Sequence, residues 1–406
     1  MPNVVFVAPF FAETTLRFAR AMSREPGVRC GLLSQQPLDQ VPVDVRRGFV
    51  AHERVEAALD AERLVQGVRA LTPRMGGVDR LVGILEQLQI PLAAARRELG
   101  LPGMGPETAR NFRDKARMKT LLAGAGIPCA RHRLVTDRRE ALTFASEVGF
   151  PLVFKPPAGA GARSTFRVDD EEAFWKGLQI SAPGPATPLL IEEFVTGREY
   201  SFDCVMVRGE PVWHSFSRYL PSPLEVLENP WIQWCVVLPR RVDDPLYQEV
   251  HRVGTGALQV LGLETGIAHM EWFERPGGGI AISEVGARPP GAQITSMLSY
   301  AHDFDIYRGW ARLMAFDSFE PPPRRWAVAT LFLRGQGQGR VVAVHGLDRA
   351  QRELGPLVVE VKLPSKGQAS GSGYEGEGYV ILRHAETRVV VDGVRRLMEL
   401  VRVELG

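Results

Sequence analysis

The chain has 406 residues and a formal net charge of +2, with 45% hydrophobic and 24% charged residues. This is the composition of an ordinary globular protein of about two to four domains, and its balanced charge argues against a polyanion-binding protein driven by bulk charge. The four cysteines form no CxxC pair and no apolar run is long enough to cross a bilayer, which argues against disulfide-framework, cysteine-metal and membrane proteins.

The N-terminus predicts the first strand of an α/β domain. Its sequence, MPNVVFVAPFF, lacks the basic start and long apolar run of a signal peptide, so the reducing cytoplasm is the simplest setting. The pattern predicts a strand, a helix and a second strand over residues 3–8, 14–23 and 28–33. The loop over residues 9–13 has no glycine, so the dinucleotide fingerprint is absent and NAD is not expected.

Residues 51–105 complete this first domain. We expect a long helix, a strand and a second helix over residues 51–71, 80–84 and 86–99. Gly100-Leu101-Pro102-Gly103 ends the second helix and marks a boundary near residue 105. A basic amphipathic helix over residues 108–124 opens the next region.

A lysine ends an apolar strand in that region. The strand covers residues 151–157 and holds Lys155, and the small-residue stretch 158–165 leads into another strand over residues 165–168. This order is typical of a flexible loop between two antiparallel strands. A lysine there can reach phosphate oxygens, and glycines let backbone N–H groups approach a phosphate. An exposed lysine beside an ordinary hairpin explains the same pattern.

The next two predicted strands cover residues 189–195 (LLIEEFV) and 200–207, and three glutamates lie in or beside them. Glu192 and Glu193 lie near the end of the first strand, and Glu199 directly precedes the second. An edge segment between two lobes can offer its backbone to an adenine, and a carboxylate just after it can bind ribose hydroxyls. Solvated charges at a strand end explain the same residues.

Residues 266–291 predict a β-hairpin with a glutamate on each strand. Glu271 and Glu284 lie in apolar runs joined by Gly277-Gly278-Gly279. Two carboxylates held close repel each other unless a cation lies between them, and Mg²⁺ prefers such oxygen ligands. Two outward-facing residues of an ordinary hairpin are the alternative. A helix over residues 303–316 is expected to pack behind the hairpin.

The order of these features resembles the ATP-grasp superfamily. The features are the basic helix, the lysine strand with its loop, the Glu-Glu-Phe-Val segment and the glutamate hairpin ending in Arg288. The resemblance covers about residues 1–320. It implies a mixed α/β and α+β fold with a Rossmann-like preATP-grasp domain, an ATP-grasp domain and a C-terminal α+β segment, over residues 1–105, 106–320 and 321–406. Within the ATP-grasp domain it implies a lid subdomain and a C-terminal lobe, over about residues 115–190 and 191–320.

The resemblance also implies a role for each candidate site residue. The phosphates of ATP would be bound by Lys115, Lys155 and the loop that holds Gly159 and Gly161. The adenine would meet Glu192, Glu193 and Val195, the ribose Glu199, and Mg²⁺ (or Mn²⁺) Glu271 and Glu284. Arg288 and Lys155 would act in catalysis. Many members carry a further metal-binding Asn two residues after the second glutamate, where this chain has Gly286, so a third protein ligand is in question.

The segments His269-Met270-Glu271 and Glu284–Arg288 resemble the L-amino-acid ligase and carnosine-synthase-like branch. That branch implies an ADP-forming ligase, which activates a carboxylate as an acyl phosphate and joins it to an amine, with an amino acid as the expected substrate. His269, Arg288 and Trp231 are the candidate substrate contacts. A hydrogen-bonded core histidine, and ordinary packing of Trp231, explain two of these residues equally well.

Two other functions stay open. One is an ATP-grasp carboxylase or formate-dependent transferase, which would act through carboxyphosphate or formyl phosphate. The other is a nucleotide-binding regulator without catalysis, although both lysines and both hairpin glutamates are present. We expect small-molecule partners and neither nucleic acid nor membrane; homodimers are common in the superfamily, but no part of the sequence indicates one here.

Overall fold

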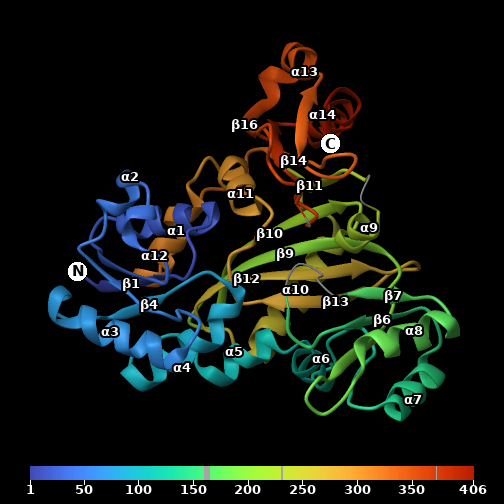
Figure 1. Ribbon diagram of the computed structural model, residues 1–406, viewed down its shortest axis with the longest axis horizontal. Helices are drawn as coiled ribbons and strands as arrows, with labels where there is room; N and C mark the ends of the chain where they lie inside the picture. The colour runs from blue at the N-terminus through green and yellow to red at the C-terminus, as the bar shows by residue number, and fades with distance from the viewer. Residues whose placement is uncertain (160–164, 230–231, 372) are drawn as a thin grey trace.

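The computed structural model describes residues 1–159, 165–229, 232–371 and 373–406. Figure 1 shows an N-terminal lobe, a small lobe and a C-terminal lobe arranged around one long sheet. The mixed α/β and α+β class expected from the sequence is confirmed. No helix in the described ranges is long and apolar enough to cross a membrane.

The N-terminal lobe is a parallel four-stranded sheet flanked by helices. In the order β3-β2-β1-β4, its strands are Ala51–Arg54, Arg29–Ser34, Asn3–Ala8 and Arg80–Val82. Its helices α1 to α4 are Glu13–Ser23, Val43–Arg46, Ala61–Met75 and Gln89–Leu99. The predicted helix over residues 51–71 is wrong in its first part, because residues 51–54 pair with β2. Asp60 then caps α3 by accepting a hydrogen bond from the Arg63 N–H at 2.9 Å.

The predicted basic helix over residues 108–124 is two helices, α5 (Pro106–Arg113) and α6 (Lys115–Gly124). Asp114 separates them because its backbone is extended, and it caps α6 by accepting from the Arg117 N–H at 3.0 Å. Lys115 is therefore the first residue of α6. Its N–H donates to the carbonyl of Pro157 (2.9 Å), which ties the helix to the small lobe.

The small lobe is an antiparallel sheet in the order β5-β8-β6-β7, covered by α7 (Arg138–Val148) and α8 (Glu171–Ser181). Its four strands, in that order, are His132–Val135, Leu189–Glu193, Leu152–Lys155 and Phe166–Val168. The predicted lysine hairpin is confirmed as β6 and β7, with Phe154 opposite Phe166 and Lys155 as the last residue of β6.

The large sheet is antiparallel, in the order β13-β12-β9-β10-β11-β14-β17-β16. Its strands, in that order, are Ile280–Gly286, Gly266–Glu274, Arg198–Val207, Glu210–Leu220, Trp234–Leu238, Ala327–Leu333, Gly378–His384 and Val358–Lys362. The predicted glutamate hairpin is confirmed as β12 and β13, with Glu271 directly opposite Glu284. Since β14 pairs with β11, the sheet continues into the C-terminal tail. The domain boundaries near residues 105 and 320 stay predictions.

The helices of the large sheet include α9 (Pro223–Glu228), α10 (Pro245–Leu261), α11 (Ile294–His302) and α12 (Ile306–Phe316), and the C-terminal lobe adds α13 (Leu347–Leu354) and α14 (Thr387–Leu400). Helix α12 packs chiefly against the N-terminal lobe and also contacts β12, so the expectation that it lies behind the hairpin is confirmed only in part. The Trp310 ring lies 6.0 Å from that of Phe6 and 5.1 Å from that of Phe18. An apolar helix face alone does not specify its partner. This packing joins the N-terminal lobe and the large sheet in one core.

Candidate active site

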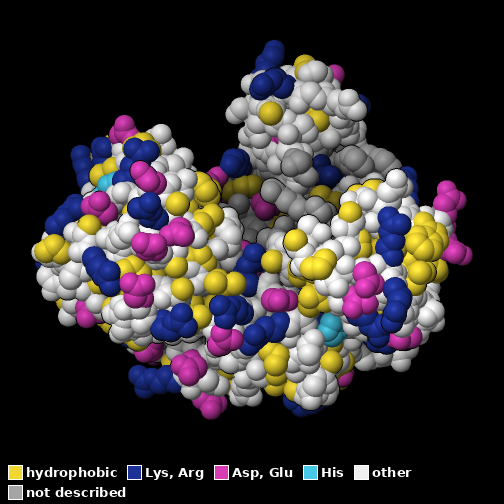
Figure 2. Space-filling view, turned by 60° about the horizontal axis from the view of Figure 1, so that its bottom comes forward, with side chains coloured by type: hydrophobic (Ala, Val, Ile, Leu, Met, Phe, Trp, Pro, Cys, Tyr) yellow, Lys and Arg dark blue, Asp and Glu magenta, His cyan; other side chains and the backbone are white. Residues whose placement is uncertain are grey.

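The two hairpin glutamates line a single cavity of about 170 Å³. The register of β12 and β13 shifts after Glu271, so that Trp272 is opposite Ile282 and Ser283 is bulged. A bulge of this kind re-aims side chains and here breaks the strand alternation beside Glu284. Figure 2 shows the surface hollowed between the lobes, with charged side chains on the walls.

The two carboxylates have opposite electrostatic surroundings. Burial raises the pKa of Glu271, and the neighbouring Glu284 carboxylate adds to this effect. Burial also tends to raise the pKa of Glu284, but Lys115 and Lys155 outweigh it and hold the pKa below its usual range. The Lys115 ammonium lies 2.5 Å from Glu284 Oε1. Without a further cation, Glu284 is therefore the readily ionised member of the pair.

This donor set fits a magnesium ion bound together with a nucleotide. Mg²⁺ is usually held by one or two carboxylates plus substrate phosphates, and keeps water at its other positions. Glu271 and Glu284 supply the two carboxylates. In the described part of the chain, no group of three or more His, Cys, Asp or Glu side chains is arranged to hold a metal. Gly286 supplies no side-chain ligand, so phosphate or water oxygens would complete the coordination shell of a magnesium ion bound here.

A lysine-rich wall faces these glutamates. Lys155 Nζ lies 2.9 Å from Glu192 Oε2, and Lys119 Nζ lies 3.5 Å from the same oxygen. Lys119 also donates to the carbonyl of bulged Ser283 at 2.7 Å. Burial tends to lower the pKa of Lys155, but the Glu192 carboxylate outweighs it, so the pKa is raised. Lys155 therefore keeps its positive charge inside the cavity.

The end of β8 and the residues directly after it line the cavity, and both carboxylates at the end of this strand are already engaged. Glu193 pairs with Arg131 and Arg275 at 2.7 and 2.8 Å, and Glu192 is held by the lysines. Val195 lines the cavity beside both glutamates. The expectation that this segment meets an adenine through its main chain stays a prediction.

Glu199 lines the same cavity as the hairpin glutamates. Burial raises its pKa well above the usual range, and Glu271 and Glu284 raise it further. A carboxyl group that is easily protonated can donate as well as accept a hydrogen bond. Both abilities suit contact with a sugar hydroxyl.

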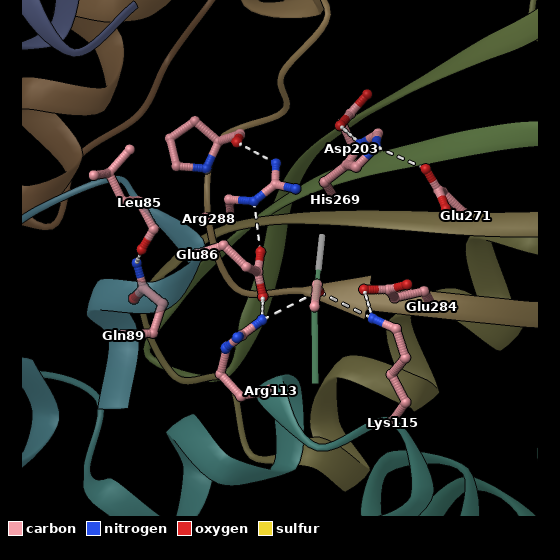
Figure 3. Close-up of polar contacts among 12 residues, drawn as sticks. Leu85, Glu86, Gln89, Arg113, Lys115, Asp203, His269, Glu271, Glu284 and Arg288 are labelled. Carbon is pink, nitrogen blue, oxygen red and sulfur yellow. Dashed lines mark hydrogen bonds and ion pairs between the residues drawn. The ribbon is translucent and has the colours of Figure 1, made fainter. Parts of the chain in front are cut away.

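Arg288 is held by a carboxylate from the N-terminal lobe. Glu86 Oε2 accepts from Arg288 Nε at 2.6 Å, and Glu86 Oε1 accepts from Arg113 at 3.1 Å. Figure 3 shows Glu86 between the two guanidinium groups, with Lys115 reaching Glu284 nearby. A β-carbon at Gly286 would lie 3.1 Å from Glu86 Oε2. The glycine at this position therefore leaves space for Glu86.

His269 is both a satisfied core residue and part of the cavity wall. Its Nδ1 lies 2.7 Å from Asp203 Oδ1, its Nε2 lies 3.2 Å from the Tyr219 hydroxyl, and Glu271 Oε1 is 3.9 Å from Nε2. Asp203 is fully buried, and its other carboxylate oxygen has no hydrogen-bond partner within the described residues. The Asp203 contact orients the imidazole toward Glu271.

Three aromatic side chains also contribute to the cavity wall. Tyr219, Trp234 and Tyr374 all line the cavity. The Trp234 ring lies 5.5 Å from that of Tyr219 and 4.5 Å from that of Tyr374. Of the other candidates, Gly159 lines the cavity, whereas Trp231 and Gly161 lie outside the described residues.

Several cavity residues escaped the sequence-based prediction. Glu86, Tyr219 and Tyr374 line the cavity itself, whereas Lys119 and Asp203 lie behind it, in contact with Glu192 and His269. Lys119 had a signal, since it follows Lys115 by one helical turn on α6. The others reach the cavity through long-range packing that no local pattern specifies.

The chain is similar to known proteins in sequence and in fold. Residues 120–298 match the ATP-grasp domain family. An uncharacterised protein of Sinorhizobium fredii is 26% identical over 78% of this chain and 66% of its own length. The L-arginine-specific L-amino acid ligase of Bacillus subtilis is 24% identical over 58% of this chain and 57% of its own length. The chain thus aligns with less than two thirds of either relative.

The solved structure of an L-amino acid ligase from Bacillus licheniformis has the same fold. It superposes with a TM-score of 0.80 at 18% identity, covering 100% of this chain and 99% of that protein. The N5-carboxyaminoimidazole ribonucleotide synthetase of Thermotoga maritima superposes with a TM-score of 0.72 at 18% identity, covering 100% of both chains.

Proposed function

We propose that the protein, whose residues 120–298 match the ATP-grasp domain family, is an ADP-forming ligase that joins a carboxylate to an amine. The observation that carries this proposal is the cavity in which Glu271 faces Glu284 beside Lys115 and Lys155. Two carboxylates and two lysines meet the needs of a triphosphate with its magnesium ion.

Amino acids are the proposed substrates. The similarity to an L-arginine-specific L-amino acid ligase supports this class. Arg288 gives the cavity a fixed guanidinium, which binds a carboxylate through parallel hydrogen bonds. The wall of Tyr219, Trp234 and Tyr374 is suited to an apolar side chain.

In the first step a carboxylate oxygen of the acid attacks the γ-phosphorus of ATP. The new O–P bond forms as the bond between the γ-phosphorus and the β,γ-bridging oxygen breaks, and ADP leaves. Negative charge moves over the phosphoryl oxygens, and Lys115, Lys155 and Arg288 stabilise that charge at fixed positions. A magnesium ion held by Glu271 and Glu284 would supply further positive charge at the phosphates.

In the second step the amine nitrogen attacks the carbonyl carbon of the acyl phosphate. The C–N bond forms, the bond from carbon to the phosphate oxygen breaks, and inorganic phosphate leaves. The amine must be neutral to attack and loses a proton afterwards.

The test is phosphate release from ATP with Mg²⁺ across a matrix of amino-acid pairs. We expect release only when both an acid and an amine are present, with equal amounts of ADP and amide product. Bicarbonate and formate arms address the carboxylase and transferase alternative, which predicts release with those anions. Nucleotide binding without phosphate release in any arm would instead support a regulator and contradict the ligase proposal.

A further inference from the structure

A second, larger cavity of about 740 Å³ lies between the N-terminal lobe and the large sheet. It is lined by the ends of β4 and α4, the turn between β9 and β10, the segment between α10 and β12, and one face of α12. The apolar part of its wall includes Leu81, Met104, Ile267, Trp310 and Met314. Arg288 lines both cavities, so the second cavity adjoins the proposed active site without sharing its glutamates.

Arg96 is the unusual residue of this cavity. It is only 5% exposed, yet its hydrogen bonds go to main-chain carbonyls, from Nε to Leu81 at 2.8 Å and from Nη1 to Met104 at 3.5 Å. No acidic side chain in the described ranges lies within salt-bridge distance of it. Burial alone lowers the pKa of Arg96 to about 10, with no carboxylate to offset it.

A buried guanidinium without a counter-charge is costly, because a charge taken out of water needs a partner of opposite sign. Arg288 shows the usual solution, since Glu86 pairs with it at 2.6 Å. Arg96 has five N–H donors, and the two carbonyl contacts leave the remaining donors for another acceptor. A carboxylate matches this donor geometry in a bidentate manner.

We propose that this cavity is a binding site for a small apolar carboxylate, whose carboxylate pairs with Arg96 and whose hydrocarbon part lies against Trp310 and Met314. Charged side chains of both signs also line the cavity, among them Glu264 and Asp317, and Asp317 lies 3.9 Å from Arg80. Arg96 supplies the positive charge that no carboxylate in the described ranges pairs with, and the apolar wall favours a hydrocarbon over an inorganic anion. The inference does not depend on the proposed ligase activity, and its test therefore omits ATP.

The probe is 4-methylpentanoate, and the readout is the fluorine NMR signal of Trp310 in protein labelled with 5-fluorotryptophan. The Trp310→Phe variant identifies that signal. We expect a saturable shift with 4-methylpentanoate, a smaller or no shift with the matched amine 3-methylbutylamine, and weaker binding of inorganic phosphate. Because a hydrogen-bonded charge pair is lost, Arg96→Gln should weaken binding by about tenfold or more.

A second variant keeps the test decisive if Arg96→Gln does not fold. Gly105 lines the cavity, has φ −79°, and a β-carbon there would meet no atom within 4 Å. Gly105→Leu should therefore fold, fill part of the cavity and weaken binding, while Gly124→Leu, also free of neighbours within 4 Å, is its control. The proposal is overturned if 4-methylpentanoate does not move the Trp310 signal, or if either cavity variant binds it as tightly as the wild type. Tighter binding of phosphate than of 4-methylpentanoate would also overturn it.

Discussion

Glu86 connects the N-terminal lobe to Arg288, so the Glu86→Gln substitution probes this connection directly. The carboxylate contacts Arg288 at 2.6 Å and Arg113 at 3.1 Å, and the three side chains are 9%, 23% and 15% exposed. The substitution keeps the shape of the side chain but removes its charge. Two guanidinium groups then share one neutral acceptor in a buried setting.

The expected loss of stability is large. Breaking a buried ion pair by removing one partner costs about 3–5 kcal/mol, and we expect the lower end because the amide oxygen still accepts one hydrogen bond. Glu98→Gln is the matched control in the same lobe, since the Arg69–Glu98 pair is 3.1 Å apart but 63% and 54% exposed. Loss of such a surface pair costs about 0–1 kcal/mol.

Arg288 loses its support as well, so activity should fall with stability. A displacement of about 1 Å in a catalytic group can reduce turnover about a hundredfold, and we expect a loss of that order in kcat for phosphate release. Urea unfolding and steady-state phosphate release are measured on both variants. If Glu86→Gln unfolds like Glu98→Gln and keeps the wild-type kcat, Glu86 does not position Arg288.

Three further predictions concern the cavity and the buried histidine. Lys155→Ala should raise the KM for ATP by about tenfold or more through loss of a charged contact. Its control is Lys176→Ala on the exposed face of α8, which should leave this KM unchanged. If both variants have the same KM for ATP, Lys155 does not bind the phosphates. Tyr374→Ala should change the relative kcat/KM for large and small apolar acids by about tenfold, and an unaltered substrate profile would place the tail outside the substrate site. Burial lowers the pKa of His302 from 6.5 to about 4. Between these values the unfolded chain holds a proton that the folded chain lacks, so stability is full above pH 6.5 and falls toward pH 4 by about 1.4 kcal/mol per pH unit. The slope of unfolding free energy against pH should be shallower in His302→Phe, and identical slopes would contradict this origin.

Local patterns predicted those parts of the fold whose order is set within a short stretch. The hairpin of Glu271 and Glu284 was predictable because glycines joined two apolar runs, and the Lys155 hairpin for a similar reason. The helix predicted over residues 51–71 was wrong only in its first part, because residues 51–54 form β3 and pair with β2, which is a tertiary contact. The single helix predicted over residues 108–124 missed the break between α5 and α6, although aspartate, here Asp114, is a common helix cap.

The lining of the candidate site was only partly predictable. Glu86 lies 202 residues before Arg288, and no pattern near either residue indicates that they meet. Tyr374 comes from the C-terminal tail, between β16 and β17, and it reaches the cavity because β14 and β17 continue the large sheet into that tail. Residue identity and spacing thus indicated the charged groups on the hairpins, whereas the groups that orient them depend on packing between lobes.

The measurement that tests the central claim most directly follows the oxygen atoms of the acid. The acid is labelled with heavy oxygen in its carboxylate and incubated with ATP, Mg²⁺ and the amine that gives the fastest phosphate release. Transfer through an acyl phosphate places one labelled oxygen in each inorganic phosphate, which phosphorus NMR detects, and Glu284→Gln should abolish the transfer while the circular dichroism spectrum is unchanged. Unlabelled phosphate, formation of AMP and pyrophosphate, or wild-type transfer by Glu284→Gln would contradict the account.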